Sequence, residues 1–369
     1  MFSPSTSAGS ATAAAARSWL RLVPLSIAVL SMIAGLYGGL IRLGVALPAE
    51  AQSAAEFHGA LMVSGFLGTV ISLERAVAFG RLWPYAAPLL SGVGAVALIA
   101  DAPRVGALAF ASAGAVMLLA SVNIAVRQLA LFTIVLSVAA ACWMAGSLQW
   151  LPGAFTPAVT GWWLNFLILT IAAERLELSR MRDLSPASRV AFAGASLLLL
   201  SGSVRGELAQ SAAPLTAAGL FGFSVWLLWY DVARRTIRLP GLPRFSAVAI
   251  LLGHCWLGVA AVFLAMAPAG ATAFSYDASV HAITIGFALS MILGHAPIIL
   301  PAVTGIRLRY SGVAYASLVL LHISVVLRIA GDILEQGDLR RAGGLATVLA
   351  LAAYAITLVF ASVIKTSRG

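Results

Sequence analysis

Five histidines are the residues of this sequence best placed to carry chemistry. His58, His254, His281, His295 and His322 each lie within or at the end of a long apolar run. An imidazole can bind a metal ion through a ring nitrogen or carry a proton. Ionisable side chains inside a membrane span are costly and mark functional sites by default. The alternative is a neutral histidine that hydrogen-bonds to a neighbouring helix. Because four of the five fall in the last four apolar runs, we favour a site.

His58 and His281 form the strongest candidate pair. Each lies at the start of an apolar run that enters the membrane from the same side, and His281 follows Asp277 by four residues. The two imidazoles are therefore expected at nearly the same depth, where they could hold a planar macrocycle from both faces. Haem iron accepts imidazole in that axial position. The alternative is two interfacial histidines that anchor helix ends.

A haem carries two propionates, which need cations in an otherwise apolar site. Arg42, Arg205 and Arg328 lie near the outer ends of apolar runs and could supply them. An arginine there is costly unless it is paired or reaches the membrane interface. Arg328 could instead pair with Asp332 one turn later, and Arg205 with Glu207. Arg42 has no obvious local acidic partner, which makes it the most informative of the three.

The composition determines what kind of scaffold must position these residues. The chain has 369 residues, of which 61% are hydrophobic and 10% are charged, whereas soluble domains carry roughly 25% charged residues. The net charge of +10 comes from basic residues that punctuate apolar runs and do not cluster on one element. A water-soluble enzyme and a nucleic-acid binder are therefore excluded. The composition predicts a polytopic membrane protein in a lipid bilayer.

The apolar runs predict an all-α bundle of about twelve transmembrane helices, because a span needs about 20 apolar residues. The runs are 22–47, 58–79, 83–101, 104–126, 128–150, 156–176, 188–206, 213–231, 245–267, 277–300, 311–332 and 342–364. Connections between them are short, which predicts one transmembrane domain over residues 17–369. The Ser/Ala-rich residues 1–16 predict a disordered cytoplasmic tail.

The distribution of basic residues predicts the orientation of the bundle. With the N-terminus in the cytoplasm, six of the 23 basic residues fall on the outer half and the other seventeen on the inner side. The six are Arg42, Arg104, Arg205, Arg328, Arg340 and Arg341. An excess of Lys and Arg marks the cytoplasmic side of membrane proteins. Both termini are therefore expected in the cytoplasm.

A faint internal repeat relates three of the runs. The pairs Glu74–Arg75 and Glu174–Arg175 lie 100 residues apart at the ends of the second and sixth runs. Gly286–Phe287 in the tenth run matches Gly65–Phe66 in the second at an offset of 221 residues, which places His295 opposite Glu74. These matches suggest a four-helix unit used three times.

Two segments resemble known haem-associated families. Phe57–Phe66 (FHGALMVSGF) resembles the second helix of the NnrS family, membrane proteins of the nitric-oxide response, and the His-Gly-x-x-Met start of helix 2 in haem–copper oxidase subunit I. The segment that starts at His281 is similar to the His-containing late helix of NnrS. In the oxidases, helices 2 and 10 supply the axial histidines of a low-spin haem in a twelve-helix body. The resemblance implies a b-type haem between His58 and His281, with Arg42, Arg328 and Met62 beside it.

The sequence also departs from both families. The NnrS motif typically continues His-x-His-Glu-Met, but Ala60 and Leu61 occupy those positions here. Residues 156–206 contain no histidine, so the copper ligands of oxidase helices 6 and 7 are absent, and Ile283 replaces the second histidine of oxidase helix 10. An oxygen-reducing binuclear centre is therefore not expected, and whether the chain is an enzyme stays open.

The remaining three histidines suggest a weaker second site. His254 and His322 fall near the middle of their runs, and His295 lies about 21 Å along the helix from His281, at 1.5 Å per residue. Imidazoles suit copper, zinc or iron, and Glu74 and Glu174 could approach His295 if the repeat is real. The alternatives are an interfacial ion pair for the glutamates and histidines bonded to backbone carbonyls.

Two functions follow from these patterns. The first is a haem-binding protein of the bacterial inner membrane, used in electron transfer or in the nitric-oxide stress response, with a small gas ligand or a redox partner. The second is a secondary transporter in which the histidines relay protons or contact substrate. Gly/Pro-interrupted segments such as 294–305 are a transporter feature.

Overall fold

The computed structural model describes residues 7–48, 52–151, 156–179, 184–209, 213–266 and 272–363, and within these ranges all regular secondary structure is helical. The helices are α1 (Ser7–Arg42), α2 (Gln52–Glu56), α3 (His58–Ala60), η2 (Leu61–Gly68), α4 (Thr69–Phe79), η3 (Trp83–Tyr85), α5 (Ala86–Ile99), α6 (Pro103–Arg127), α7 (Leu131–Trp150), α8 (Pro157–Ser179), α9 (Pro186–Val204), η4 (Glu207–Ala209), α10 (Pro214–Tyr230), α11 (Ala233–Thr236), α12 (Leu242–Met266), α13 (Thr272–His281), η5 (Ala282–Leu289), α14 (Ser290–Thr304), α15 (Ala314–Ile333) and α16 (Gly337–Val363).

Within the described ranges, nine helices are long and apolar enough to cross a membrane. They are Ser18–Arg42, His58–Phe79, Pro103–Arg127, Leu131–Trp150, Pro186–Val204, Leu242–Met266, Ser275–Thr304, Ala314–Ile333 and Gly337–Ser362. Trp83–Ile99 and Pro214–Tyr230 are shorter apolar helices. The 23-residue helix α8 carries Glu174, Arg175 and Glu177 in its last turns. The chain is therefore an all-helical protein with the length and composition of a multi-span membrane protein.

The N-terminal helix begins earlier than the sequence predicted. The disordered tail was expected over residues 1–16, but α1 already begins at Ser7, and residues 1–6 lie outside the described ranges. The alanine-rich stretch before Arg17 explains the difference, because alanine has the highest helix propensity. The Pro24 ring does not end α1, which continues to Arg42.

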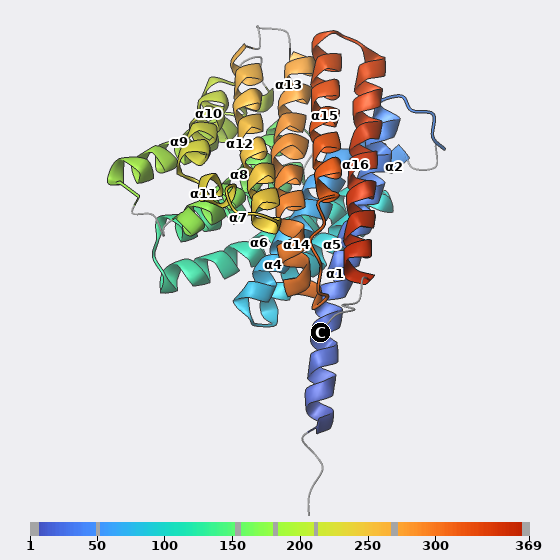
Figure 1. Ribbon diagram of the computed structural model, residues 1–369, viewed down its shortest axis with the longest axis vertical. Helices are drawn as coiled ribbons and strands as arrows, with labels where there is room; N and C mark the ends of the chain where they lie inside the picture. The colour runs from blue at the N-terminus through green and yellow to red at the C-terminus, as the bar shows by residue number, and fades with distance from the viewer. Residues whose placement is uncertain are drawn as a thin grey trace, which may run out of the picture.

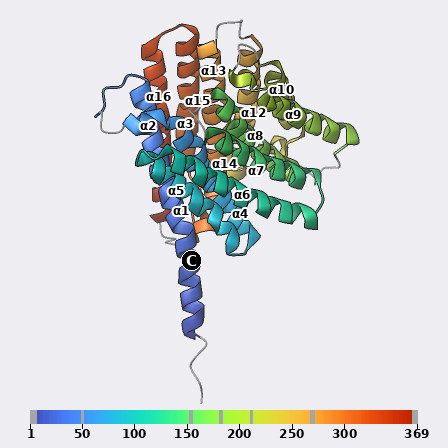
Figure 2. The same cartoon turned by 180° about the vertical axis from the view of Figure 1, so that it is seen from behind.

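The long helices pack into one bundle whose two described ends lie together. In Figure 1, α12, α13, α15 and α16 stand side by side, while α9 and α10 form one edge and α1 the other. Figure 2 shows α5, α6 and α7 crossing the opposite side. Both views place the start of α1 and the end of α16 at the lower end of the molecule. The chain therefore returns to the end at which it starts.

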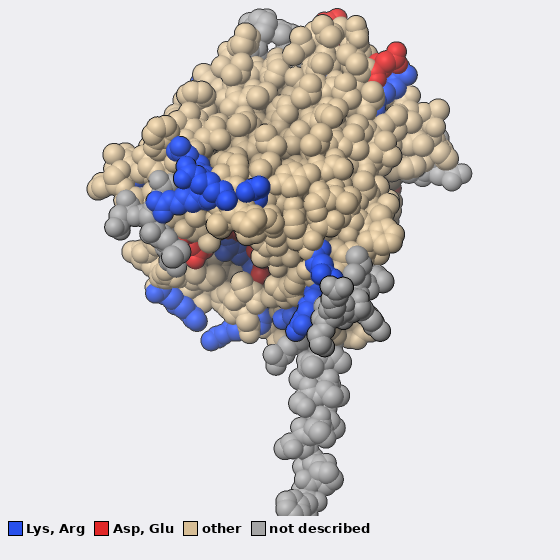
Figure 3. Space-filling view, viewed as in Figure 1, with Lys and Arg blue, Asp and Glu red and all other residues tan. Residues whose placement is uncertain are grey.

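The surface is apolar over most of its area, as a lipid-facing surface requires. Large side chains such as Leu129 and Val126 are about four-fifths exposed. On the face in Figure 3, most visible Lys and Arg side chains gather on the left and along the lower part, and a small mixed group of charges lies at the upper right. Charge is thus distributed unequally between the two ends of the bundle.

Glycines allow the helices to approach closely, a common device in membrane bundles. A Cβ atom on Gly114 of α6 would lie 2.8 Å from the Met144 backbone nitrogen of α7. A Cβ atom on Gly343 of α16 would lie 2.8 Å from the Arg328 backbone nitrogen of α15. Because even a methyl group would clash, these two helix pairs pack backbone against backbone.

Candidate functional site

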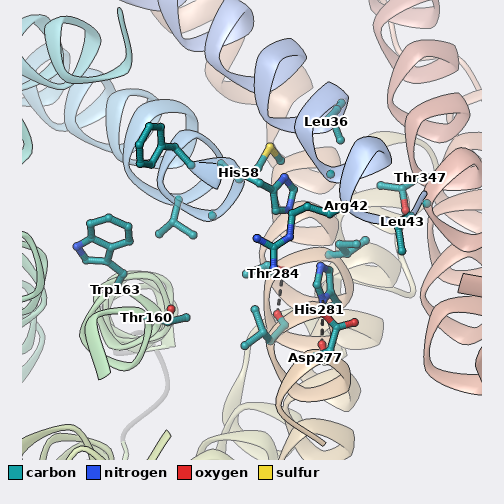
Figure 4. A pocket seen from close by; sticks show the side chains of 18 of the residues that line it. Leu36, Arg42, Leu43, His58, Thr160, Trp163, Asp277, His281, Thr284 and Thr347 are labelled. Atoms are coloured by element: carbon teal, nitrogen blue, oxygen red, sulfur yellow. Dashed lines mark hydrogen bonds and ion pairs between the residues drawn. The ribbon is translucent and has the colours of Figure 1, made fainter. Parts of the chain in front are cut away.

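One cavity of about 500 Å³ lies between α1, η2, α8, η5, α15 and α16. The five residues that the sequence singled out for a cofactor all line it: Arg42, His58, Met62, His281 and Arg328. Figure 4 shows the side chains of His58, Arg42 and His281 projecting into the same space. The fold therefore brings together residues that are up to 286 positions apart in the sequence.

His58 is held by a backbone carbonyl of another helix. It is the first residue of α3, and its Nδ1 lies 2.6 Å from the carbonyl oxygen of Gly35 in α1. A carbonyl oxygen only accepts, so Nδ1 carries the proton and Nε2 keeps its lone pair. The ring packs directly on α1, because a Cβ atom on Gly39 would lie 2.8 Å from His58 Cε1. His58 therefore has a fixed tautomer, with the proton on Nδ1 and a lone pair on Nε2.

His281 reaches the same chemical state by a different arrangement. It is the last residue of α13, and its Nδ1 lies 2.8 Å from the carbonyl oxygen of Asp277 in the preceding turn. The same nitrogen lies 3.5 Å from Oδ1 of the Asp277 carboxylate. Nε2 is again the unprotonated nitrogen. An imidazole whose Nδ1 donates to a carbonyl or carboxylate is the usual state of a metal-ligating histidine.

Each histidine is followed by a short π-helical segment of eight residues. These segments are η2 (Leu61–Gly68) and η5 (Ala282–Leu289), and they match residue for residue at the 221-residue offset of the sequence repeat. Such segments are rare and occur frequently at functional sites. The wider turn shifts the face that each helix presents below the histidine. The second and tenth predicted runs therefore share a local distortion that no sequence pattern indicated.

The pairing of Arg328 differs from the one considered from sequence. Arg328 does not pair with Asp332 on its own helix; its Nε and Nη2 donate to the Asp277 carboxylate at 3.1 and 2.9 Å. Arg340 lies 2.7 Å from the Asp332 carboxylate and 3.5 Å from that of Asp277. Packing between helices explains the difference. Helix α13 brings the Asp277 carboxylate to Arg328, and α16 brings the Arg340 guanidinium to Asp332. A charge network thus backs His281.

Glu207, the acidic partner considered for Arg205, caps a helix. Its carboxylate accepts hydrogen bonds from the Thr216 amide at 2.9 Å and from the Thr216 hydroxyl at 3.0 Å. An acid at a helix N-terminus satisfies free amides and complements the helix dipole. Arg205 does not line the cavity. Of the three arginines considered for the propionates, the cavity contains Arg42 and Arg328.

Arg42 is the cation of the cavity that has no carboxylate within ion-pair distance among the described residues. Its Nη1 makes one long contact, 3.5 Å, to the carbonyl oxygen of Ala55. In Figure 4 its guanidinium extends into the space between the His58 and His281 rings. An exposed, flexible side chain in that position can follow an anionic group at the mouth of the cavity.

The walls of the cavity are mainly apolar and aromatic. Phe57, Trp150 and Trp163 form a contiguous aromatic side, with ring centroids 6.0 Å apart for Phe57 and Trp150 and 5.8 Å for Trp150 and Trp163. Tyr276 closes another part and donates to the Thr160 hydroxyl at 3.0 Å. Concave, mostly apolar sites with few polar groups are typical for cofactors.

Two site residues were missed by the sequence reading. Asp277 marked only a helix start there, although its position four residues before His281 places both side chains on one helix face. The spacing could have indicated it. Gly35 contributes only its carbonyl oxygen to His58, and no side-chain pattern signals such a contact.

The structure does not bring the other three histidines into this cavity. Both His322 nitrogens are engaged within the protein: Nδ1 accepts from Trp256 Nε1 at 2.8 Å, and Nε2 lies 3.3 Å from Ser290 Oγ. His322 is therefore held in the tautomer opposite to that of His58. Its surroundings give it a packing role between α12 and α15.

His254 and His295 belong to a second polar group, here called the inner cluster and composed of Arg175, Asp231, His254 and His295. Arg175 makes two 2.7 Å bonds to the Asp231 carboxylate. His254 Nε2 lies 3.5 Å from that carboxylate and is fully buried. His295 Nδ1 bonds the Met291 carbonyl at 2.8 Å, and its Nε2 lies 3.4 Å from Arg175 Nη1. One buried imidazole and one partly buried imidazole thus lie beside a buried ion pair.

The second metal site therefore lacks a convergent ligand set in the part of the chain that the structure describes. No three His, Cys, Asp or Glu side chains there meet at a point that could hold a metal ion. The contact to His295 expected from Glu74 or Glu174 comes from Arg175 instead. Glu174 pairs with Arg75 at 2.7 Å, so the ion pair joins two helices of the sequence repeat.

The comparison with protein families gives one result. A family model described as a domain of unknown function (DUF8744) matches residues 21–363. The chain belongs to this family. Curated proteins include no match to the chain. For this DUF8744 member, the match runs from within α1 to the end of α16. The family description contains no activity, and the functional argument rests on the cavity.

Proposed function

We propose that this protein binds a b-type haem between His58 and His281 and uses it for electron transfer or in a nitric-oxide stress response. The observation that carries the proposal is the matched state of the two imidazoles. Each has Nδ1 bound to a carbonyl oxygen, and both line one cavity from different helices. The resemblance to the NnrS and haem–copper oxidase motifs supports the same assignment.

The residues present fit such a group. A cavity of about 500 Å³ lies within the roughly 300–1,000 Å³ range of cofactor pockets. Aromatic and aliphatic walls suit the face of a macrocycle, and Arg42 supplies an uncompensated cation for a carboxylate. Arg328, expected beside a propionate, is bound to Asp277, so its charge is already largely offset. The fit therefore favours Arg42 as the principal partner of an anionic edge.

Each chain residue then has a defined role. His58 and His281 would hold the iron through Nε2, while Gly35 and Asp277 fix their ring orientation. Haem supplies a one-electron couple whose potential depends on axial ligands and their hydrogen bonds. Trp150 and Trp163 exclude water from the cavity wall. Met62, one turn after His58, fills the space beside the His58 ring.

We also propose that the bundle crosses a bacterial inner membrane twelve times with both termini in the cytoplasm. Nine crossings would place the start of α1 and the end of α16 on opposite sides, whereas they lie at the same end (Figure 1). If Trp83–Ile99, α8 and Pro214–Tyr230 also cross the membrane, the number of crossings is twelve, and an even number returns the chain to the side on which it starts. The excess of basic residues toward the end where α4 and α14 finish supports a cytoplasmic assignment of that end.

The threefold relationship within this bundle is part of the same proposal. Helices α4, α8 and α14 contain the aligned positions Glu74–Arg75, Glu174–Arg175 and His295. Arg75 of the first contacts Glu174 of the second, and Arg175 of the second contacts His295 of the third. The arginine of one repeat thus contacts the aligned residue of the next repeat in both cases. The equivalent positions of η2 and η5 in the first and third repeats are a further match.

An absorption spectrum of the purified full-length protein tests the haem proposal. We expect a Soret band that shifts on reduction, and we expect the variant H58A/H281A to lose it. His322→Ala is the matched control, because His322 lies outside the cavity and its variant should keep the band. A wild-type protein without a Soret band, or an unchanged band in the double variant, would rule the proposal out.

The transporter alternative predicts a colourless protein with the same fold. Its sequence support was the number of helices, the internal repeat and the Gly/Pro-interrupted segment near residues 294–305, but α14 continues through Pro297 and Pro301 to Thr304. Neighbouring helices can satisfy the backbone groups that prolines release in membrane helices. The specific feature that favoured a broken helix is therefore absent from α14.

A further inference from the structure

The two histidines of the cavity are supported unequally, and the difference begins at His281. Its Nδ1 faces both the carbonyl oxygen and the carboxylate of Asp277. Asp277 is in turn bound by Arg328 and contacted by Arg340. Residues of α13, α15 and α16 thus hold His281 from behind. A carboxylate behind an imidazole fixes its orientation and raises its basicity as a metal ligand.

His58 has a weaker electronic support. Its Nδ1 meets one neutral acceptor, the carbonyl oxygen of Gly35, and among the described residues no carboxylate lies within ion-pair distance of this nitrogen. At His281 the charge of Arg328 is offset by its direct bonds to Asp277. His58 is therefore expected to be the poorer electron donor of the pair.

We propose that His58 is the exchangeable ligand and that a neutral diatomic gas binds on its side of the cavity. This inference rests on the proposed haem. With haem bound, His281 would be the firmly held ligand, and His58 would be the residue that yields its place to the diatomic molecule. No electron is transferred in this exchange, and His58 keeps its Nδ1 proton on the Gly35 carbonyl.

The surroundings of His58 suit a small neutral ligand. Leu36, Met62, Val63 and Leu67 line the cavity on this side, and they offer no charge to an ion. Two charged residues, Arg42 and Glu56, also line this side of the cavity, and the Arg42 guanidinium reaches toward the space beside the ring (Figure 4). It can donate a hydrogen bond to a polar diatomic molecule once this is bound. A polar diatomic molecule such as carbon monoxide or nitric oxide therefore fits this part of the cavity.

Carbon monoxide binding to the reduced, full-length protein in detergent micelles tests this assignment. We expect the wild-type Soret band to shift with carbon monoxide at a rate limited by release of His58. The variant H58A should keep haem and bind carbon monoxide at least tenfold faster, whereas H281A should lose most of its haem. His322→Ala, outside the cavity, should match the wild type in both measurements.

Two further measurements keep the test decisive if H58A does not fold. Asp277→Asn should slow carbon monoxide binding severalfold, because it weakens the donor opposite His58. Arg42→Leu should raise the C–O stretching frequency of the bound ligand, since it removes the hydrogen-bond donor. A purely structural role for Arg42 would change haem content and leave that frequency unmoved.

The outcomes separate this inference from the haem proposal. A wild-type protein without a Soret band overturns both. A Soret band that does not shift with saturating carbon monoxide overturns the gas site alone and leaves the haem assignment standing. Faster carbon monoxide binding in H281A than in H58A does the same. Rates unchanged in Asp277→Asn would likewise contradict the unequal support of the two histidines.

Discussion

The cavity and the inner cluster contain the same residue types and use them in opposite ways. Each has two histidines and an aspartate, together with two arginines in the cavity and one in the inner cluster. In the cavity, His58 and His281 bind backbone carbonyl oxygens through Nδ1 and line a common pocket. In the inner cluster, His254 and His295 turn Nε2 toward the Arg175–Asp231 pair. The comparison teaches that the partner of each ring nitrogen, more than the number of histidines, separates a ligand site from a structural one.

The largest effect is expected from breaking the inner cluster. Asp231→Ala removes the partner of Arg175, whose side chain is 5% exposed beside a fully buried carboxylate. An uncompensated buried cation costs about 3–5 kcal/mol. We expect this loss in reversible unfolding in mixed micelles. Asp338→Ala, at a carboxylate that is 93% exposed, is the control and should change stability by less than about 0.5 kcal/mol.

That result would sharpen the comparison in a second way. The purified fraction of Asp231→Ala that stays folded should keep the Soret band expected for the wild type, because the inner cluster does not line the cavity. Equal stability of Asp231→Ala and Asp338→Ala would show that the inner cluster does not have the structural role assigned to it.

A smaller effect on stability, but a large one on the site, is expected from Gly39→Ala. The new Cβ would lie 2.8 Å from His58 Cε1 and 3.0 Å from Nδ1. Overfilling a packed site costs about 1–3 kcal/mol, and it pushes His58 off the Gly35 carbonyl. We expect haem content to fall by more than half, measured as Soret absorbance per protein.

Gly194→Ala provides the matched control for that experiment. A Cβ at Gly194 meets nothing within 4 Å, and alanine favours the helix over glycine by about 1 kcal/mol. Stability should therefore stay equal or rise while haem content is unchanged. If Gly39→Ala behaved like Gly194→Ala, the ring of His58 would not be seated on α1 as described.

Much of the scaffold could be predicted from sequence because a bilayer restricts the choices. Backbone groups in lipid must be satisfied within the segment, so long apolar runs become helices. The run direction alone predicted that His58 and His281 would lie near each other, and both line the same cavity. The sequence motifs and the positions near helix ends also predicted Arg42, Met62 and Arg328 as site residues, and all three line the cavity.

The rest depended on contacts between helices, which a single sequence does not encode locally. Arg328 had an acidic residue one turn away but binds Asp277 on another helix. His254, His295 and His322 shared the residue type of the ligand pair, yet their partners come from helices distant in sequence. The π-helical segments have no composition of their own. Each miss is a case in which tertiary packing outweighed local spacing.

A modest effect on stability is expected at His322, which belongs neither to the cavity nor to the inner cluster. Trp256→Phe removes the donor to His322 Nδ1 and leaves a partly buried acceptor unmatched, at a cost of about 0.5–1.5 kcal/mol. The Soret band should stay unchanged. Trp19→Phe, at a side chain that is 66% exposed, is the control. A lost Soret band in Trp256→Phe would extend the cavity site to His322 and erase its separation from the ligand pair.

The smallest effect tests whether burial or distance sets the strength of the inner contacts. Arg75–Glu174 and Arg175–Asp231 both close at 2.7 Å, but the first pair is 21% and 34% exposed while the second is 5% and 0% exposed. A double-mutant cycle with Arg75→Ala and Glu174→Gln should give a coupling of about 0.2–1 kcal/mol, typical of solvent-accessible pairs, and the coupling should shrink as salt is raised. The two pairs have equal distances, so a coupling energy as large as the stability lost in Asp231→Ala would mean that distance alone sets the strength of these contacts. A small coupling energy that falls with salt would mean that burial makes Arg175–Asp231 the structural pair.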